Sequence, residues 1–195
     1  MKSNSINSNI RILMFLIGNK EKKFTIKQIS ENTKINYRIA YEQIMKLEKE
    51  ELVKVTPIGN SKMCEFTNTF NSHVYEAEYQ RKEDLFKNKD FRVIHNQLSE
   101  LNFPFILLLF GSYAKGTQTK NSDIDLLLIS KDEEEKIINN KLNLLPHNIH
   151  LTQVTYEAFI RMIKSKDFSV VSEAIKNNII LIGVEDYYKL LKNAR

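Results

Sequence analysis

Two aspartates, Asp123 and Asp125, are the residues of this sequence best suited to hold a metal ion. They open an apolar run, residues 126–129, which is typical of a buried strand. Alternate residues of a strand point to the same side, so both carboxylates would face one way, with their Cα atoms roughly 7 Å apart. Magnesium binds one or two protein carboxylates together with phosphate oxygens and water. The pair therefore predicts a Mg²⁺ site that serves a phosphate-bearing ligand.

A glycine and a serine, Gly111 and Ser112, precede Asp123 with ten residues between, and they follow a second apolar run, residues 105–110. Glycine permits a tight turn and a close approach of the backbone to a ligand. Ser112 offers a hydroxyl and a backbone amide to phosphate oxygens. We expect two buried strands joined by a phosphate-binding loop.

This pattern resembles the motif of the nucleotidyltransferases of the DNA polymerase beta superfamily, especially its small stand-alone members. It consists of Gly-Ser, ten further residues and then Asp-x-Asp on an apolar strand. The resemblance implies that Gly111, Ser112 and Ser122 bind a nucleoside triphosphate, with ATP as the first choice. It implies that Asp123 and Asp125 are catalytic and hold Mg²⁺. Small members of the family are often antitoxins that modify a partner toxin, so a protein hydroxyl is the leading acceptor of the nucleoside monophosphate.

The family normally carries a third carboxylate on a later strand, and this sequence shows none at that place. The predicted strand, residues 149–154, places His150 and Thr152 on one face and Gln153 on the other. His150 and Thr152 are therefore the candidate third-site positions. A neutral His150 can accept a proton, but it adds no negative charge to hold a second metal ion. Two readings stay open: a Mg²⁺-dependent enzyme, or a transcription regulator whose C-terminal domain binds nucleotide or dimerises without catalysis.

The first third of the chain resembles a winged helix-turn-helix. Apolar spacing predicts helices over residues 6–20, 25–32 and 37–50, and alternation predicts a β-ribbon over residues 52–56 and 62–67. Glu51 stands where a glycine often ends such a helix, so we expect the third helix to run on slightly. The side chains expected to contact duplex DNA share the outward face of that helix or lie on the wing: Tyr37, Arg38, Tyr41, Lys46, Lys49 and Lys62.

The charge distribution supports a polyanionic partner for this part of the chain. Residues 1–70 contain 12 Lys and Arg against 7 Asp and Glu, whereas residues 71–195 contain 17 of each, so the net charge of +5 lies in the first third. A mildly basic solvated surface is nearly as common, and a winged helix can also serve dimerisation or partner contact. Double-stranded DNA is the partner we expect, and a homodimer is left open.

The 195 residues suffice for two small domains, and 42% apolar with 27% charged residues is ordinary for a globular chain. We expect an α+β protein with a winged helix-turn-helix domain over residues 1–70. A small mixed-sheet nucleotidyltransferase domain with flanking helices would follow over residues 71–195. The single cysteine, Cys64, excludes an internal disulfide. The sequence has no membrane span or signal-peptide pattern, so we expect a cytoplasmic protein without membrane contact.

Overall fold

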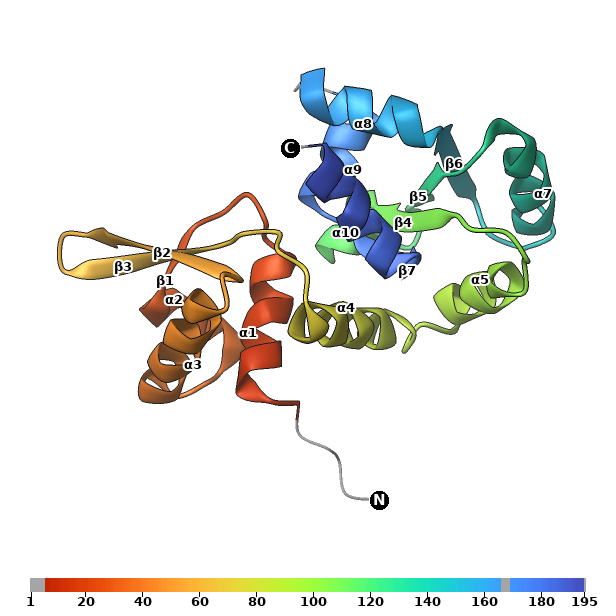
Figure 1. Cartoon of the computed structure of the whole chain (residues 1–195). Helices are drawn as coiled ribbons and strands as arrows, with labels where there is room; N and C mark the ends of the chain where they lie inside the picture. Colours follow the sequence, from red (N-terminus) through yellow and green to blue (C-terminus); the bar gives the residue numbers. More distant parts are fainter. Residues whose placement is uncertain (1–5, 166–168, 195) are drawn as a thin grey trace. The chain divides into compact units, whose positions relative to one another are not determined.

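The computed structural model describes residues 6–165 and 169–194 and confirms the mixed α+β class (Figure 1). Contacts divide the chain into two compact units, Met1–Gln80 and Arg81–Arg195. The division falls inside the helix α4 (Ser72–Leu85), whereas the sequence suggested a boundary at residue 70. Within the described residues, no helix combines the length and the apolar content needed to cross a membrane.

The N-terminal unit packs helices against a small antiparallel sheet of strand order β1-β3-β2. Thr25 caps the second helix through a capping box with Gln28, and Asn36 caps the third. Residues 34–36 alone form the turn between these two helices. Before α4, its elements are α1 (Ser8–Ile17), β1 (Phe24–Thr25), α2 (Ile26–Thr33), α3 (Tyr37–Lys49), β2 (Val53–Ile58) and β3 (Ser61–Phe66).

The end of α3 corrects one expectation. The helix stops at Lys49 and does not run on, because Glu51 itself takes the left-handed conformation, with φ of 60°. The backbone amide of Leu52 then donates to the carbonyl of Leu47 at 2.9 Å, which closes the helix end. A non-glycine residue in this conformation costs about 1–2 kcal/mol, so the turn holds glutamate in a strained backbone geometry.

The C-terminal unit is built on a mixed sheet of strand order β6-β5-β4-β7. The strand β4 is antiparallel to β5 and to β7, and β5 is parallel to β6. After α4, its elements are α5 (Lys89–Ser99), β4 (Ile106–Phe110), α6 (Gly111–Lys115), β5 (Ile124–Ile129), α7 (Asp132–Leu142), β6 (Ile149–Val154), α8 (Tyr156–Ser165), α9 (Val170–Lys176), β7 (Ile179–Ile182) and α10 (Val184–Asn193).

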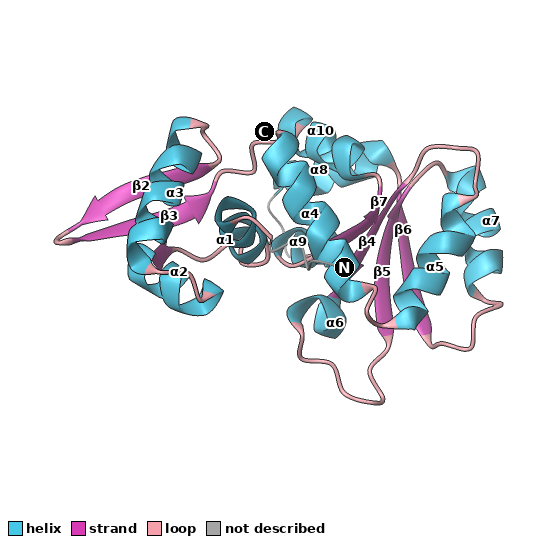
Figure 2. Ribbon diagram, turned by 90° about the horizontal axis from the view of Figure 1, so that it is seen from below, coloured by secondary structure: helices cyan, strands magenta, loops and turns pink. Residues whose placement is uncertain are grey.

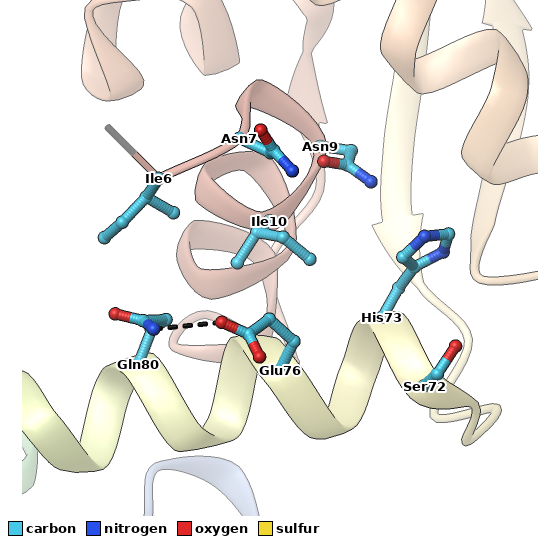
Figure 3. Close-up of a pocket in the computed structure, with 8 residues that line it drawn as sticks. All are labelled: Ile6, Asn7, Asn9, Ile10, Ser72, His73, Glu76 and Gln80. Atoms are coloured by element: carbon cyan, nitrogen blue, oxygen red, sulfur yellow. Dashed lines mark hydrogen bonds between the residues drawn. The ribbon is translucent and has the colours of Figure 1, made fainter. Parts of the chain in front are cut away.

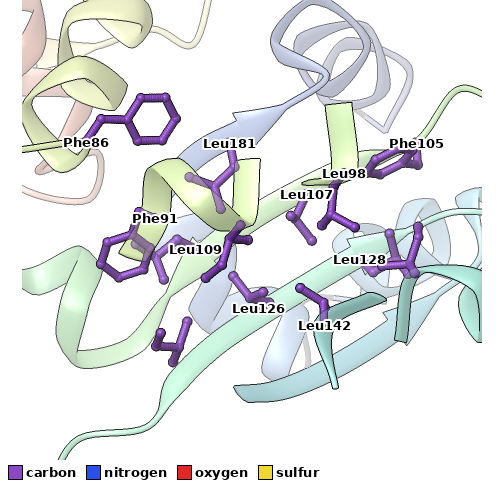
Figure 4. Close-up of a cluster of buried hydrophobic side chains, with 13 residues drawn as sticks. Phe86, Phe91, Leu98, Phe105, Leu107, Leu109, Leu126, Leu128, Leu142 and Leu181 are labelled. Atoms are coloured by element: carbon purple, nitrogen blue, oxygen red, sulfur yellow. The ribbon is translucent and has the colours of Figure 1, made fainter. Parts of the chain in front are cut away.

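The two central strands are covered on both faces, as their continuous apolar runs predict. Figure 4 shows Leu107 and Leu109 of β4 beside Leu126 and Leu128 of β5, within one apolar cluster that also takes residues from α5 and α7. In Figure 2, α5 and α7 lie on one side of the sheet, and α8 and α10 lie on the other. Strand alternation turns Asp125 away from the α5 and α7 cluster and toward that second side.

One detail differs from the sequence expectations. The segment after β4 is the short helix α6 rather than a loop from Gly111 onward, and the irregular loop starts at Gly116. On the last helix, α10, Tyr187 and Tyr188 are buried and pack in the core.

The strained turn after α3 gives a stability prediction. Glu51→Gly should raise the free energy of unfolding by about 0.5–1 kcal/mol, because glycine enters the left-handed region without the penalty on Cβ. Lys49→Gly, at the last helical residue, is the matched control and should lower it by about 0.5–1 kcal/mol. Urea unfolding of the full chain measures both variants. An unchanged or lowered stability of Glu51→Gly would show that the turn is not strained.

Candidate functional site

The site is organised where β4 ends beside the start of β5. Phe110 and Asp125 are register partners, so the next residue, Gly111, comes to lie against the Asp125 side chain. A Cβ added at Gly111 would stand 2.1 Å from Oδ2 of Asp125, and φ of Gly111 is +69°. Both the conformation and the space require glycine here, and the vacant side of Gly111 faces the carboxylate.

The two aspartates converge on a common side with His150. Asp125 and His150 are register partners in the parallel pair β5 and β6. The Nδ1 atom of His150 lies 3.8 Å from Oδ1 of Asp125 and 4.0 Å from Oδ2 of Asp123. The residue predicted at the third-carboxylate position is therefore beside the pair, as an imidazole.

A residue that the sequence reasoning missed, Asn148, holds Asp123. Its side-chain amide donates to Oδ1 of Asp123, and its backbone carbonyl accepts from the amide of Ile124 at 2.9 Å. Asn148 directly precedes β6, as Asp123 directly precedes β5. Parallel pairing of these two strands, which the sequence pattern did not reveal, would have indicated the contact.

The environment of Asp125 disfavours the charged form of its carboxyl group. Burial raises the pKa of the Asp125 carboxyl, and the neighbouring charge of Asp123 raises it further, whereas His150 lowers it. A divalent cation between the carboxylates would relieve both effects, because it offsets the like charges and replaces lost water.

The donor set fits magnesium. Among residues 6–165 and 169–194, no group of three or more His, Cys, Asp or Glu side chains is placed to hold a metal ion. An ion on Asp123 and Asp125 would therefore take its other ligands from phosphate and water, which is the pattern Mg²⁺ adopts with nucleotides. The absence of a side chain at Gly111 lets the Asp125 carboxylate lie directly against the turn that follows β4.

The other predicted site residues lie at different distances from the pair. Ser112 follows Gly111 on α6 and is half-buried. The Ser122 hydroxyl accepts a hydrogen bond of 2.8 Å from the backbone amide of Thr119, so it helps to close the loop before Asp123. Thr152 is the register partner of Leu127, roughly 7 Å beyond His150 along the strand. Of the two candidate third positions, the structure brings His150 to the carboxylates.

A second pair that sequence reasoning missed joins α6 to α9. The Nζ atom of Lys115 lies 2.9 Å from Oε1 of Glu173. Both charges influence the pKa of Asp125, behind burial as the main cause. Because Glu173 is far along the chain and on a helix without a motif, no local pattern could have found it.

The predicted DNA-contacting residues gather on α3 and β3. Tyr37 is 53% exposed, and Lys46 and Lys49 are exposed on the same helix. Two of these side chains are held by neighbours. Arg38 pairs with Glu42 at 3.1 Å, and Nζ of Lys62 donates to the Tyr41 hydroxyl at 3.0 Å.

A pocket of about 670 Å³ lies elsewhere, in the N-terminal unit between the start of α1 and α4 (Figure 3). Its polar lining includes Asn7, Asn9, His73 and Glu76, and Glu76 accepts from Gln80 at 2.9 Å. None of the predicted site residues lines it. The convergence of chemically active side chains therefore favours the carboxylate pair over this pocket as the functional site.

The close approach of Gly111 to Asp125 gives a prediction. Gly111→Ala should displace the Asp125 carboxylate and weaken Mg²⁺-dependent ATP binding at least tenfold, measured by calorimetry. Gly116→Ala is the matched control: its φ is +68°, but a Cβ there would meet nothing within 4 Å. Both variants should lose about 1–2 kcal/mol of stability from backbone strain, and only Gly111→Ala should lose the ligand. Equal nucleotide affinity in the two variants would contradict this geometry.

Comparison with known proteins agrees with the site. Residues 91–182 match the family described as "Nucleotidyltransferase domain". The chain is also 34% identical over 55 residues to "Protein adenylyltransferase MntA" of Shewanella oneidensis, an alignment that covers 28% of this chain and 37% of that protein. The chain thus spans little more than a third of the length of the curated relative it matches. No solved structure matches the chain. The matched segment contains Gly111, Ser112, Asp123, Asp125 and His150, and residues 91–182 are therefore a nucleotidyltransferase domain.

Proposed function

We propose that the chain transfers a nucleoside monophosphate, with ATP as the preferred donor, to a hydroxyl group of another protein. The observation that carries the proposal is the convergence of Asp123 and Asp125 around His150, with the Gly111 turn directly against the Asp125 carboxylate. The family match over residues 91–182 supports nucleotidyl transfer in general. The donor, the acceptor and the residue roles below are our proposals.

In the proposed reaction, Asp123 and Asp125 hold Mg²⁺, and Gly111 and Ser112 hold the triphosphate. The acceptor hydroxyl oxygen forms a bond to the α-phosphorus, the bond from that phosphorus to its bridging oxygen breaks, and pyrophosphate leaves. The hydroxyl proton passes to a base or to water. When bound, magnesium would neutralise part of the negative charge of the phosphates. The protein contributes mainly by positioning the reactants and by preorganised charge.

The choice of a protein hydroxyl as the acceptor rests on similarity to other proteins. The relative in Shewanella oneidensis is named a protein adenylyltransferase, which favours a protein hydroxyl as acceptor and AMP as the transferred group. A partner toxin is the candidate substrate that the antitoxin-like resemblance suggests.

One observation favours a second candidate, a nucleotide-binding regulator without turnover. His150 stands beside the pair at the place where a third carboxylate is expected, and an imidazole adds no negative charge for a second metal ion. We therefore expect transfer by the isolated protein to be slow, and in this alternative it is absent while nucleotide binding persists.

Labelled ATP tests the proposal. The full chain is incubated with Mg²⁺ and ATP labelled at the α-phosphate, with and without lysate of its source. Label should enter protein, and Asp123→Asn with Asp125→Asn should reduce incorporation at least a hundredfold, because the metal site is lost. Glu157→Ala, an exposed acid on α8, should leave incorporation unchanged. Nucleotide binding without label transfer under any condition would support the regulator instead.

For the N-terminal unit we propose a winged helix-turn-helix that binds duplex DNA. The order α1, β1, α2, α3, β2, β3, the short capped turn between α2 and α3, and the exposed face of α3 support this assignment. The net positive charge of residues 1–70 provides the attraction to phosphates. Lys46, Lys49 and Lys62 would contact phosphates, while Tyr37, Arg38 and Tyr41 face the base edges.

Salt dependence tests this binding. With four to six phosphate contacts, affinity for duplex DNA should fall by roughly two to three decades between 50 and 200 mM salt. Lys46→Ala with Lys49→Ala should weaken binding and flatten the salt dependence, whereas Lys136→Ala with Lys141→Ala, on α7 of the other unit, should change neither. Failure of the full chain to retard any fragment of a genomic library at 50 mM salt would remove the DNA-binding proposal.

A further inference from the structure

We propose that two copies of this chain pair through the free edge of β6, antiparallel to each other and centred on Leu151, so that their two sheets join into one. The strand β6 ends the sheet on one side, opposite β7 (Figure 2). Among residues 6–165 and 169–194, no other strand pairs with its outer side. The pairing does not depend on the proposed transfer activity, and it brings a residue of the second copy to the candidate site.

The two edges of this sheet differ in how they are protected. The strand β7 has four residues, and its register with β4 shifts between Leu107 and Leu108. Short strands, irregular register, charged side chains and proline are the means by which proteins keep an edge from pairing with another chain. The strand β6 has six residues in unbroken register with β5, and residues 149–154 include no Lys, Arg, Asp, Glu or Pro. Its edge is therefore open to a further strand.

The backbone groups at this edge follow from the pairing of β6 with β5. The amide of Ile124 donates to the carbonyl of Asn148 at 2.9 Å, and the amide of Ser130 donates to the carbonyl of Val154 at 3.2 Å. Alternate residues of a strand direct their amide and carbonyl groups to opposite sides. The even-numbered residues from 148 to 154 thus face β5, and the backbone groups of residues 149, 151 and 153 face the free edge.

These three residues make the edge complementary to itself. In an antiparallel pair centred on Leu151, this residue faces its own counterpart, and Ile149 faces Gln153 in both directions. All three residues of each copy then form backbone hydrogen bonds, and no like charges meet. The side chains of Ile149 and Leu151 are only partly buried against the apolar cluster under α5 and α7, and a second copy would cover them further. Such two-fold self-complementarity is what a symmetric dimer requires, and it favours a second copy over an unrelated strand.

The same register places Thr152 of the second copy opposite His150. The two residues form a pair without mutual backbone hydrogen bonds, in which the Cα atoms are only about 4.5 Å apart. The His150 side chain is 66% exposed, and its Nδ1 atom faces Asp123 and Asp125. The hydroxyl of the second copy can therefore bond to the imidazole and fix its orientation beside the carboxylates. In this arrangement Thr152 is a positioning residue for the neighbouring site.

Sedimentation velocity of the full chain tests the pairing. Wild type should sediment as a dimer at micromolar concentration. Leu151→Lys should raise the dissociation constant of the dimer at least tenfold, because it sets two like charges directly opposite each other. Val93→Lys is the matched control, since Val93 is also an apolar residue with partial exposure but lies on α5, and it should leave the dimer unchanged.

Disulfide cross-linking tests the register without relying on the lysine variant. Leu151→Cys should form a covalent dimer with diamide, because Cα atoms about 5.5 Å apart suit a disulfide. His150→Cys and Thr152→Cys should each cross-link poorly alone, since each faces its own counterpart only diagonally, at about 7–8 Å. Co-expressed with different tags, these two variants should cross-link to each other. Wild type, whose single Cys64 is buried, gives the background.

Nitrogen NMR of the imidazole tests the positioning role. Thr152→Val should change the tautomer populations of His150, whereas Thr152→Ser, which retains the hydroxyl, should preserve them. Leu151→Lys should resemble Thr152→Val, because the second copy is lost. The same spectrum in all three variants and in wild type would overturn the role of Thr152 and leave the pairing in place.

Three results would overturn the pairing itself. The first is a monomeric wild type. The second is a dimer that Leu151→Lys leaves intact and Leu151→Cys does not cross-link, since its interface would lie elsewhere. The third is protection of the β6 amides from hydrogen exchange only after another protein is added, which would assign the edge to a strand of that protein. Loss of ATP binding in a dimeric protein would instead contradict the proposed function alone.

Discussion

The side of Gly111 that would carry a Cβ faces the Asp125 carboxylate, and the candidate site depends on this approach. It requires glycine for two independent reasons, because φ is +69° and because any side chain would meet Oδ2 of Asp125. The approach places the turn at the end of β4 next to the acids that open β5. A ligand held by the turn is then also in reach of the carboxylates.

The sheet explains why the remaining groups gather at the same edge. The antiparallel pairing of β4 with β5 joins the Gly111 turn to Asp125, and the parallel pairing of β5 with β6 adds His150 and Asn148. Apolar residues fill both faces of β4 and β5, so these strands form a rigid base. Residues on rigid elements keep a fixed geometry, which binding of a metal ion and positioned phosphates requires.

Local patterns were sufficient for much of this arrangement. Continuous apolar runs indicated β4 and β5, and the spacing from Gly111 to Asp125 indicated the nucleotidyltransferase domain that the family match confirms. The strand β6 has the bounds that alternation predicted. Other features depended on contacts between distant segments, which one sequence does not encode locally: Asn148 on Asp123, and Glu173 on Lys115. The predicted end of α3 was wrong. A glutamate can occupy a left-handed turn when hydrogen bonds of the surrounding backbone hold it there.

The central claim is that Asp123 and Asp125 hold the metal ion that binds the nucleotide. A crystal structure of the full chain with Mn²⁺ and a non-hydrolysable ATP analogue tests it most directly, because the anomalous signal of Mn²⁺ locates the ion. The account predicts the ion between the two carboxylates, with the α-phosphate against it and the phosphate chain passing over Gly111. A nucleotide bound away from Gly111, or an ion that contacts neither aspartate, would contradict the account.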